Sequence, residues 1–213
     1  MARELPICDT HVHLWSDDDL PPWLAGDAAL APITNAHDIA RYTSEAGSRV
    51  TSAVYLEVDV APENRRNEAE WITSLCADPT NILKGAVIGA PVVDGPVAAF
   101  EEWASEWAKN KYVKGVRQVL HVQPSGTLLR DDVVEKARLC GEKGLVFELC
   151  MRCDELADVA AFAAKVPGTR IVVDHIGGHH MLVGASEVCA TTCMPRLQLL
   201  MSVRLSAKRH GYV

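Results

Sequence analysis

The sequence alternates short apolar runs with segments of helical periodicity, and this alternation limits the fold more than any other feature. Six runs are rich in β-branched and aliphatic residues, which is typical of strands buried on both faces. These strand segments are residues 5–15, 50–60, 82–92, 113–121, 145–152 and 170–178. The helical segments between them are residues 35–47, 63–78, 97–110, 130–144 and 153–168. Strands and helices in this order predict a parallel sheet with helical crossovers.

Such a sheet is either an open doubly wound sheet or a (β/α)8 barrel. No glycine-rich phosphate loop follows the first strand, as a dinucleotide-binding sheet would require. Polar residues instead recur at the carboxyl ends of the strands, where barrel enzymes gather their chemistry. These residues are His11, His13, Glu57, Asp59, Arg117, His121, Glu148, Arg152, Asp174 and His175. We therefore predict an α/β fold of the (β/α)8 TIM-barrel type, incomplete, with about six units present and strands seven and eight missing.

The character of the sequence changes after the sixth predicted strand. Residues 178–213 carry four Lys or Arg and one Glu. Residues 1–177 carry seventeen Lys or Arg and twenty-seven Asp or Glu. No further strand–helix pairs follow, although "RLQLLMSVRL" has the pattern of one amphipathic helix. We predict a partial barrel over residues 1–178 and an atypical tail over 179–213, disordered or a single helix. A divergent but genuine C-terminal unit is the alternative.

Local signals predict where the helices end and how one of them packs. Asn35 is a candidate N-cap, and Gly141 or Gly144 is expected to end the fourth helix. Phe100, Trp103 and Trp107 fall on one helical stripe, which predicts packing against the sheet rather than a ligand site.

Composition excludes several classes of protein. A net charge of −7 argues against a nucleic-acid-binding surface, and no run of 18 apolar residues predicts a membrane span. The N-terminus lacks an apolar signal-peptide core, so we expect a cytoplasmic protein. Seven cysteines without a disulfide spacing are consistent with reduced thiols, and a structural zinc site on Cys150, Cys153, Cys189 and Cys193 is the less favoured interpretation.

The stretch "CDTHVHLW", residues 8–15, carries the most specific chemistry. His11 and His13 are two positions apart, so in a strand both side chains face one way, with Cα atoms about 7 Å apart. Two imidazoles directed at one point are suited to a metal ion or an anionic substrate. A chance pair on a buried strand is the alternative, although buried imidazoles without partners are costly.

With these residues in view, the chain resembles the amidohydrolase-related family of metal-dependent hydrolases. It looks most similar to the branch of sugar-lactone and 2-pyrone-4,6-dicarboxylate lactonases, in a C-terminally truncated form. The matching stretches are "DTHVHLW", "YLEVDVAPENRRNEAEWI", "GVRQVLH", "FELCMR", "ELADVAAFAAKVPGTR" and "VVDHIGG", within about residues 5–178.

The resemblance implies roles for individual residues. His11 and His13 match a first-strand pair that ligates a divalent ion, usually zinc, in metal-using relatives and contacts substrate in metal-free lactonases. His175 matches a sixth-strand histidine that serves as a third ligand or polarises a carbonyl. Arg117 matches an arginine suited to a substrate carboxylate, because its planar fork can donate two hydrogen bonds. His121 and Glu148, at strand ends, are further candidates for substrate binding.

The resemblance therefore implies a hydrolase that opens a small carboxylated or sugar-derived lactone through attack of activated water. The general base of such enzymes is an aspartate at the end of the eighth strand, and the present sequence stops before that strand. A metal-dependent decarboxylase of the same superfamily is the second possibility. A non-catalytic truncated isoform, acting in binding or assembly and including self-association into a homo-oligomer, is the third.

Overall fold

The computed structural model describes residues 5–17 and 20–175. These residues form two compact units, each of which is discontinuous in sequence. The first unit contains residues up to 90 together with 107–117, and the second contains 91–106 together with the residues from 118 onward. The predicted tail, residues 179–213, and the end of the predicted sixth strand lie outside the described residues.

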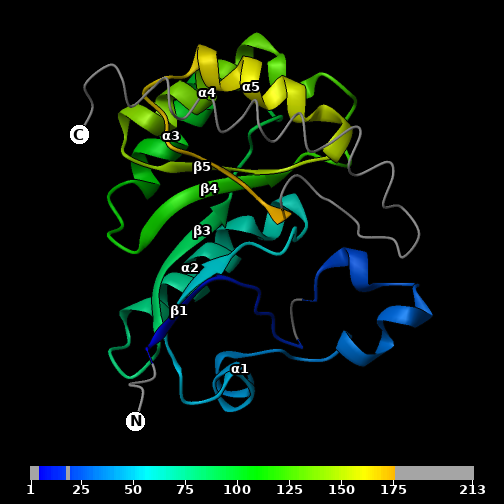
Figure 1. Cartoon of the computed structure of the whole chain (residues 1–213), viewed down its shortest axis with the longest axis vertical. Coiled ribbons are helices and arrows are strands. Elements are labelled where there is room, and N and C mark those ends of the chain that lie inside the picture. The colour runs from blue at the N-terminus through cyan, green and yellow to red at the C-terminus, as the bar shows by residue number, and fades with distance from the viewer. Residues whose placement is uncertain (1–4, 18–19, 176–213) are drawn as a thin grey trace. The chain divides into compact units, whose positions relative to one another are not determined.

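Six strands are present in the described part of the chain, and they follow one another in the sheet in sequence order (Figure 1). They are β1 (Ile7–Val12), β2 (Val50–Leu56), β3 (Leu83–Gly89), β4 (Val113–Val119), β5 (Val146–Cys150) and β6 (Ile171–Val173). The pairs β1–β2, β2–β3, β3–β4 and β5–β6 are all parallel. Sequential parallel strands joined by helical crossovers confirm the prediction of an incomplete (β/α)8-type fold.

The crossovers contain five α-helices within the described residues, and short 3-10 turns precede several of them. The α-helices are α1 (Ile39–Ala46), α2 (Arg65–Ala77), α3 (Val97–Trp107), α4 (Asp131–Glu142) and α5 (Leu156–Lys165). The 3-10 turns are η1 (Pro22–Leu24), η2 (Ala28–Ile33), η3 (Pro62–Asn64), η4 (Thr127–Leu129) and η5 (Cys153–Glu155). In the first unit α2 packs against β3, and in the second α4 packs against β5 (Figure 1).

The helix termini both confirm and correct the sequence predictions. The N-cap of α1 is Asp38 rather than Asn35, because the Asp38 carboxylate accepts the Arg41 N–H at 2.8 Å. Asn35 instead lies before the helix, where its carbonyl accepts the Trp15 indole N–H. In the second unit, Gly144 follows α4 with φ +76°, a conformation that glycine adopts without a steric penalty.

Each unit has its own apolar core. Tyr55, Leu56 and Ile72 are fully buried in the first unit, and Phe147 and Phe162 are fully buried in the second, with ring centroids 5.7 Å apart. Burial of side chains of this size contributes about 1.5–3 kcal/mol each. The predicted aromatic stripe on α3 is also a packing surface, because Phe100 and Trp107 are buried.

Candidate active site

The two histidines of the first strand form a close pair. The Nε2 atoms of His11 and His13 are 3.1 Å apart, and their rings meet edge to face at a centroid distance of 4.9 Å. Both side chains are half-buried at the carboxyl end of β1. The predicted convergence of the two imidazoles is therefore present in the structure.

A backbone carbonyl determines which nitrogen of His13 carries a proton. His13 Nδ1 lies 2.9 Å from the Leu56 carbonyl oxygen at the end of β2. Because a carbonyl only accepts, Nδ1 must be the protonated nitrogen, and neutral His13 then has its lone pair on Nε2. That lone pair faces His11 Nε2 at 3.1 Å, so it accepts a hydrogen bond from the protonated Nε2 of His11.

Asp9 and Tyr42 support the strand that carries the pair. The Asp9 carboxylate accepts the His11 backbone N–H at 3.1 Å and the Tyr42 hydroxyl at 2.7 Å. Burial, together with this hydrogen bond to Asp9, raises the pKa of Tyr42, so the phenol stays protonated and continues to donate. Tyr42 was not among the residues predicted from sequence, because a tyrosine on an amphipathic helix has no distinguishing pattern.

Glu57 and Arg117 form a buried ion pair. Arg117 donates from Nε to Glu57 Oε1 at 2.6 Å and from Nη2 to the Glu57 carbonyl oxygen at 2.5 Å. Both side chains are only 3–4% exposed. The second oxygen of Glu57 accepts the backbone N–H of Asp59, a residue with φ +53°. Two donor nitrogens of the Arg117 guanidinium thus bind Glu57 of the protein itself. The sequence analysis had predicted that the guanidinium binds a substrate carboxylate.

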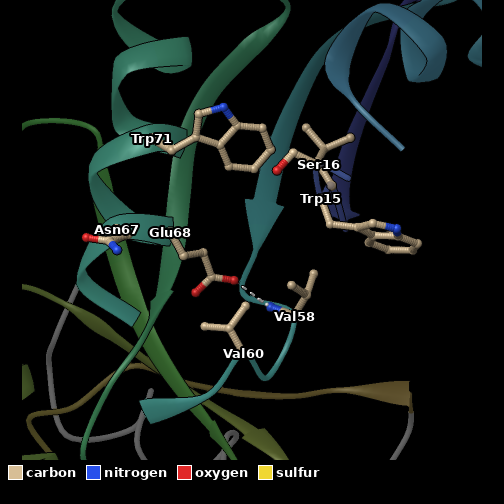
Figure 2. Close-up of a pocket in the computed structure, with 8 residues that line it drawn as sticks. Trp15, Ser16, Val58, Val60, Asn67, Glu68 and Trp71 are labelled. Carbon is tan, nitrogen blue, oxygen red and sulfur yellow. Dashed lines mark hydrogen bonds between the residues drawn. The ribbon is translucent and has the colours of Figure 1, made fainter. Parts of the chain in front are cut away.

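A second buried carboxylate holds the end of β2 from the helix side. Glu68 of α2 accepts the Tyr55 hydroxyl at 2.8 Å and the Val58 backbone N–H at 2.9 Å, both on Oε1. Figure 2 shows this bond between Glu68 and Val58 at the edge of a cavity of about 140 Å³. Trp15, Ser16, Val60, Asn67 and Trp71 also line the cavity. Glu68 therefore fixes the turn that carries Glu57.

The second unit contains a separate group of polar strand-end residues. His121, after β4, is exposed, and its Nδ1 is 3.5 Å from the Cys150 Sγ atom. Arg152 donates to the carbonyl oxygens of His121 and Gln123 and to the carboxylate of Glu155. Arg152 thus holds the loop after β4 against the end of β5. This role was not predicted.

The remaining predicted residues of this unit lie on β5 and after β6. Glu148 is buried in the middle of β5, opposite Val172 of β6. Asp174 is buried and His175 is exposed, and the His175 backbone is in the left-handed region at φ +50°. Asp59 and His175 are the only non-glycine residues with positive φ in the described part of the chain, and each follows the end of a strand.

The predicted zinc ligands are thus divided between the two units, with His11 and His13 in one and His175 in the other. Two nitrogens bound to zinc at 2.0–2.1 Å with tetrahedral angles are about 3.3 Å apart, which is close to the 3.1 Å separation here. No group of three or more potential ligands occurs within residues 5–17 and 20–175, however. The described residues therefore bring together only two of the three predicted ligands, His11 and His13, whereas a zinc site needs at least three.

A model of the amidohydrolase family matches residues 8–192 of the chain. This match covers most of the sequence and overlaps every strand described above, so the chain belongs to the amidohydrolase family. It extends beyond residue 178, where the predicted barrel segment ends. None of the curated proteins that were compared matches the chain.

Solved structures of similar fold include amidohydrolase 2 from Bifidobacterium longum subsp. infantis, at 26% identity and a TM-score of 0.69 over 93% of this chain. An amidohydrolase from Burkholderia multivorans with bound zinc matches at 17% identity and 0.76 over the same share. A probable 2-pyrone-4,6-dicarboxylic acid hydrolase from Acinetobacter baumannii, with citric acid bound, matches at 18% and 0.65, again over 93%. The present chain spans 70%, 66% and 66% of their respective lengths.

No helix in the described part of the chain is both long and apolar enough to span a membrane.

Proposed function

We propose that the protein is a hydrolase that opens small carboxylated or sugar-derived lactones by attack of activated water on the ring carbonyl. The observation that carries this proposal is the His11–His13 pair, which β1 presents at a strand end with its Nε2 atoms 3.1 Å apart. Membership of the amidohydrolase family supports a hydrolytic reaction. The lactone is inferred from the sequence resemblance described above.

Lactone hydrolysis needs a group that takes a proton from water and a group that stabilises the oxyanion. The His13 tautomer, set by the Leu56 carbonyl, leaves a lone pair on Nε2. In this structure that lone pair accepts the His11 Nε2–H, and once this bond opens it is suited either to ligating a divalent ion or to accepting a proton from substrate or water.

Three further residues are proposed to contact the substrate: Arg117, His121 and Glu148. For Arg117 the proposal is constrained by geometry, because Nε and Nη2 already bind Glu57, so a substrate carboxylate would have to replace Glu57 to use these two donors. We therefore expect Arg117 to affect the position of the β2 end at least as strongly as the affinity for substrate. His121, which is exposed at the end of β4, is the most accessible of the three.

The activity test uses the full 213-residue chain and a panel of carboxylated and sugar-derived lactones. The double variant His11→Ala/His13→Ala should lose at least about 100-fold in kcat/KM, because general acid–base groups typically contribute that much. His37→Ala is the matched control, since His37 lies in the same unit and also bonds a backbone carbonyl. Equal turnover by the double variant and the unmodified chain would rule out the proposed site.

Metal use is tested separately, by metal analysis of the purified chain and zinc titration with and without His11→Ala/His13→Ala. Stoichiometric zinc that is lost in the double variant would assign the pair as ligands. Turnover that survives removal of all divalent ions would assign it to the metal-free alternative.

The same samples separate the two rival functions. Release of carbon dioxide from carboxylated aromatic substrates, without lactone opening, would identify a decarboxylase instead. A folded chain that is inactive on both substrate classes, and that self-associates in gel filtration, would favour a role in binding or assembly.

A further inference from the structure

The second unit contains a lysine whose entire side chain is buried. Lys136 lies in the middle of α4 and is 0% exposed. Its position three residues after Val133 and four before Cys140 places it on the apolar stripe of the helix, and both of those neighbours are fully buried. A buried ammonium is costly unless its charge and all its donors are satisfied. We therefore expect hydrogen-bond acceptors for the Lys136 ammonium among the residues that surround it.

Four backbone carbonyl oxygens surround the Lys136 ammonium. Nζ lies 2.8 Å from the Asp94 carbonyl oxygen, 3.0 Å from those of Val92 and Gly95, and 3.4 Å from that of Pro91. All four belong to residues 91–95, which connect β3 to α3. The ring of Phe100, on α3, is 5.8 Å from Nζ and completes the enclosure.

The geometry identifies Nζ as a bound cation rather than a reactive amine. Carbonyls only accept, and an ammonium has three N–H donors to offer them, whereas a neutral amine has two. Burial lowers the pKa of Lys136, and the nearby carboxylates of Asp132 and Asp94 oppose that shift. With no exposed surface and its donors directed at carbonyls, Nζ is not accessible to a substrate.

A ring of backbone carbonyls is also the environment that replaces the hydration shell of a potassium ion in proteins. The ammonium group and potassium share a single charge and a preference for several neutral oxygens at about 2.8–3.0 Å. The segment 91–95 is held from its other side as well, because the Gln118 side chain accepts the Val93 N–H at 2.9 Å and donates to Asp94 Oδ2 at 3.3 Å.

We propose that residues 91–95 form a binding site for a monovalent cation, which the ammonium group of Lys136 occupies permanently. The tethered cation holds the segment after β3 in one conformation. In the absence of the lysine side chain, the carbonyl cage accepts a free potassium or ammonium ion. This inference does not depend on the proposed hydrolase activity.

The main test is chemical rescue of Lys136→Ala in the full chain. The variant should unfold about 6–12 °C below the unmodified protein in lithium chloride, as expected for a cage left without its cation. Replacing lithium by potassium or ammonium at equal chloride concentration should restore at least about 3 °C of this loss. Equal midpoints in all three salts would overturn the proposal.

Lys84→Ala is the matched control. Lys84 is exposed, and its ammonium bonds a single backbone carbonyl, that of Asn81, at 3.0 Å. Its loss should change the unfolding midpoint by less than about 2 °C, without a preference for potassium or ammonium over lithium.

A second measurement uses the unmodified protein, so it holds even where Lys136→Ala does not fold. Nitrogen-15 NMR of the lysine side chains should show one ammonium group that exchanges protons with water much more slowly than the others. Through-bond couplings from that nitrogen to backbone carbonyls would identify the cage. If every lysine ammonium exchanges rapidly, the proposal is wrong.

Discussion

Among the described residues, each of the two units buries one positively charged side chain, and the two units neutralise its charge differently. In the first unit Arg117 meets the carboxylate of Glu57, an opposite full charge. In the second, the Lys136 ammonium meets four neutral carbonyls. Removing one member of an ion pair leaves the other charge buried and unneutralised, whereas the groups that bind the Lys136 ammonium directly are uncharged carbonyls. The two cores thus accommodate a buried positive charge by two separate physical means.

The difference has a consequence for the candidate site. The Glu57–Arg117 pair lies at the ends of β2 and β4, and the Leu56 carbonyl that orients His13 immediately precedes Glu57. Disturbing this pair should therefore disturb the histidines as well. The Lys136 ammonium instead holds residues 91–95, which Gln118, the neighbour of Arg117 on β4, holds as well.

The largest effect is expected from Arg117→Met. This change leaves the buried Glu57 carboxylate without its cation and should lower the free energy of unfolding by about 3–5 kcal/mol. Urea unfolding of the variant measures the loss. The double variant Glu57→Leu/Arg117→Met should recover most of it, because an apolar pair of similar volume removes both buried charges. A double variant as unstable as the single one would show that packing rather than charge dominates here.

Two buried thiols allow each unit to be followed separately. Burial raises the pKa of Cys76, on α2, to about 11 and that of Cys140, on α4, to about 12. Both should react with thiol reagents only through local opening, because the reactive species is the thiolate.

Arg117→Met should accelerate labelling of Cys76 about tenfold or more and leave Cys140 nearly unchanged, and Lys136→Ala should do the reverse. Labelling is measured by mass spectrometry of each peptide, with exposed Cys8 as the rapid reference. Parallel acceleration of both thiols in either variant would show that the units open together.

The same thiols predict a dependence of stability on alkaline pH. The pKa of each thiol in the folded protein is higher than the ordinary value of 9.0. At a pH above 9, the folded state therefore keeps thiol protons that the unfolded state has lost. The stabilisation is complete below about pH 9 and is lost as the pH rises toward 11–12. Cys140→Ala should flatten the pH dependence of urea unfolding in this range. An unchanged slope would contradict the assignment to Cys140.

A smaller effect is expected from Tyr55→Phe. The change removes the hydroxyl that donates to Glu68 Oε1 at 2.8 Å, and a hydrogen bond to a charged group contributes about 1.5–3 kcal/mol. Tyr42→Phe, which removes a hydroxyl from Asp9 at a less buried position, is the comparison and should cost less. Urea unfolding measures the loss of unfolding free energy in each variant. A larger loss for Tyr42→Phe than for Tyr55→Phe would contradict this prediction.

The smallest effect is expected where charge is exposed. Arg138 and Glu135 of α4 form an ion pair at 2.9 Å, with both side chains close to half-exposed. Arg138→Ala should change the free energy of unfolding by less than about 1 kcal/mol, because solvent screens such pairs. The same assay provides the baseline against which the buried charges of Arg117 and Lys136 are compared.

Much of the fold was predictable from local pattern. The apolar runs predicted all six strands, although β6 (Ile171–Val173) is shorter than its predicted segment within the described residues. The ends of segments were less predictable, as the shift of the α1 N-cap from Asn35 to Asp38 shows. Asn and Asp are both favourable N-cap residues. The tertiary contact between the Trp15 indole N–H and the Asn35 carbonyl holds Asn35 outside the helix.

The sequence by itself determined the alternation of strands and helices and placed His11 and His13 on one face of a strand. These properties depend on side chains two to four residues apart, whose relation is set by the period of the element. Only the tertiary structure decided that Arg117 binds Glu57, 60 residues away, and that Lys136 binds carbonyls 41–45 residues away. Such contacts depend on strand register and loop path, and a carbonyl acceptor leaves no mark on the sequence because every residue has one.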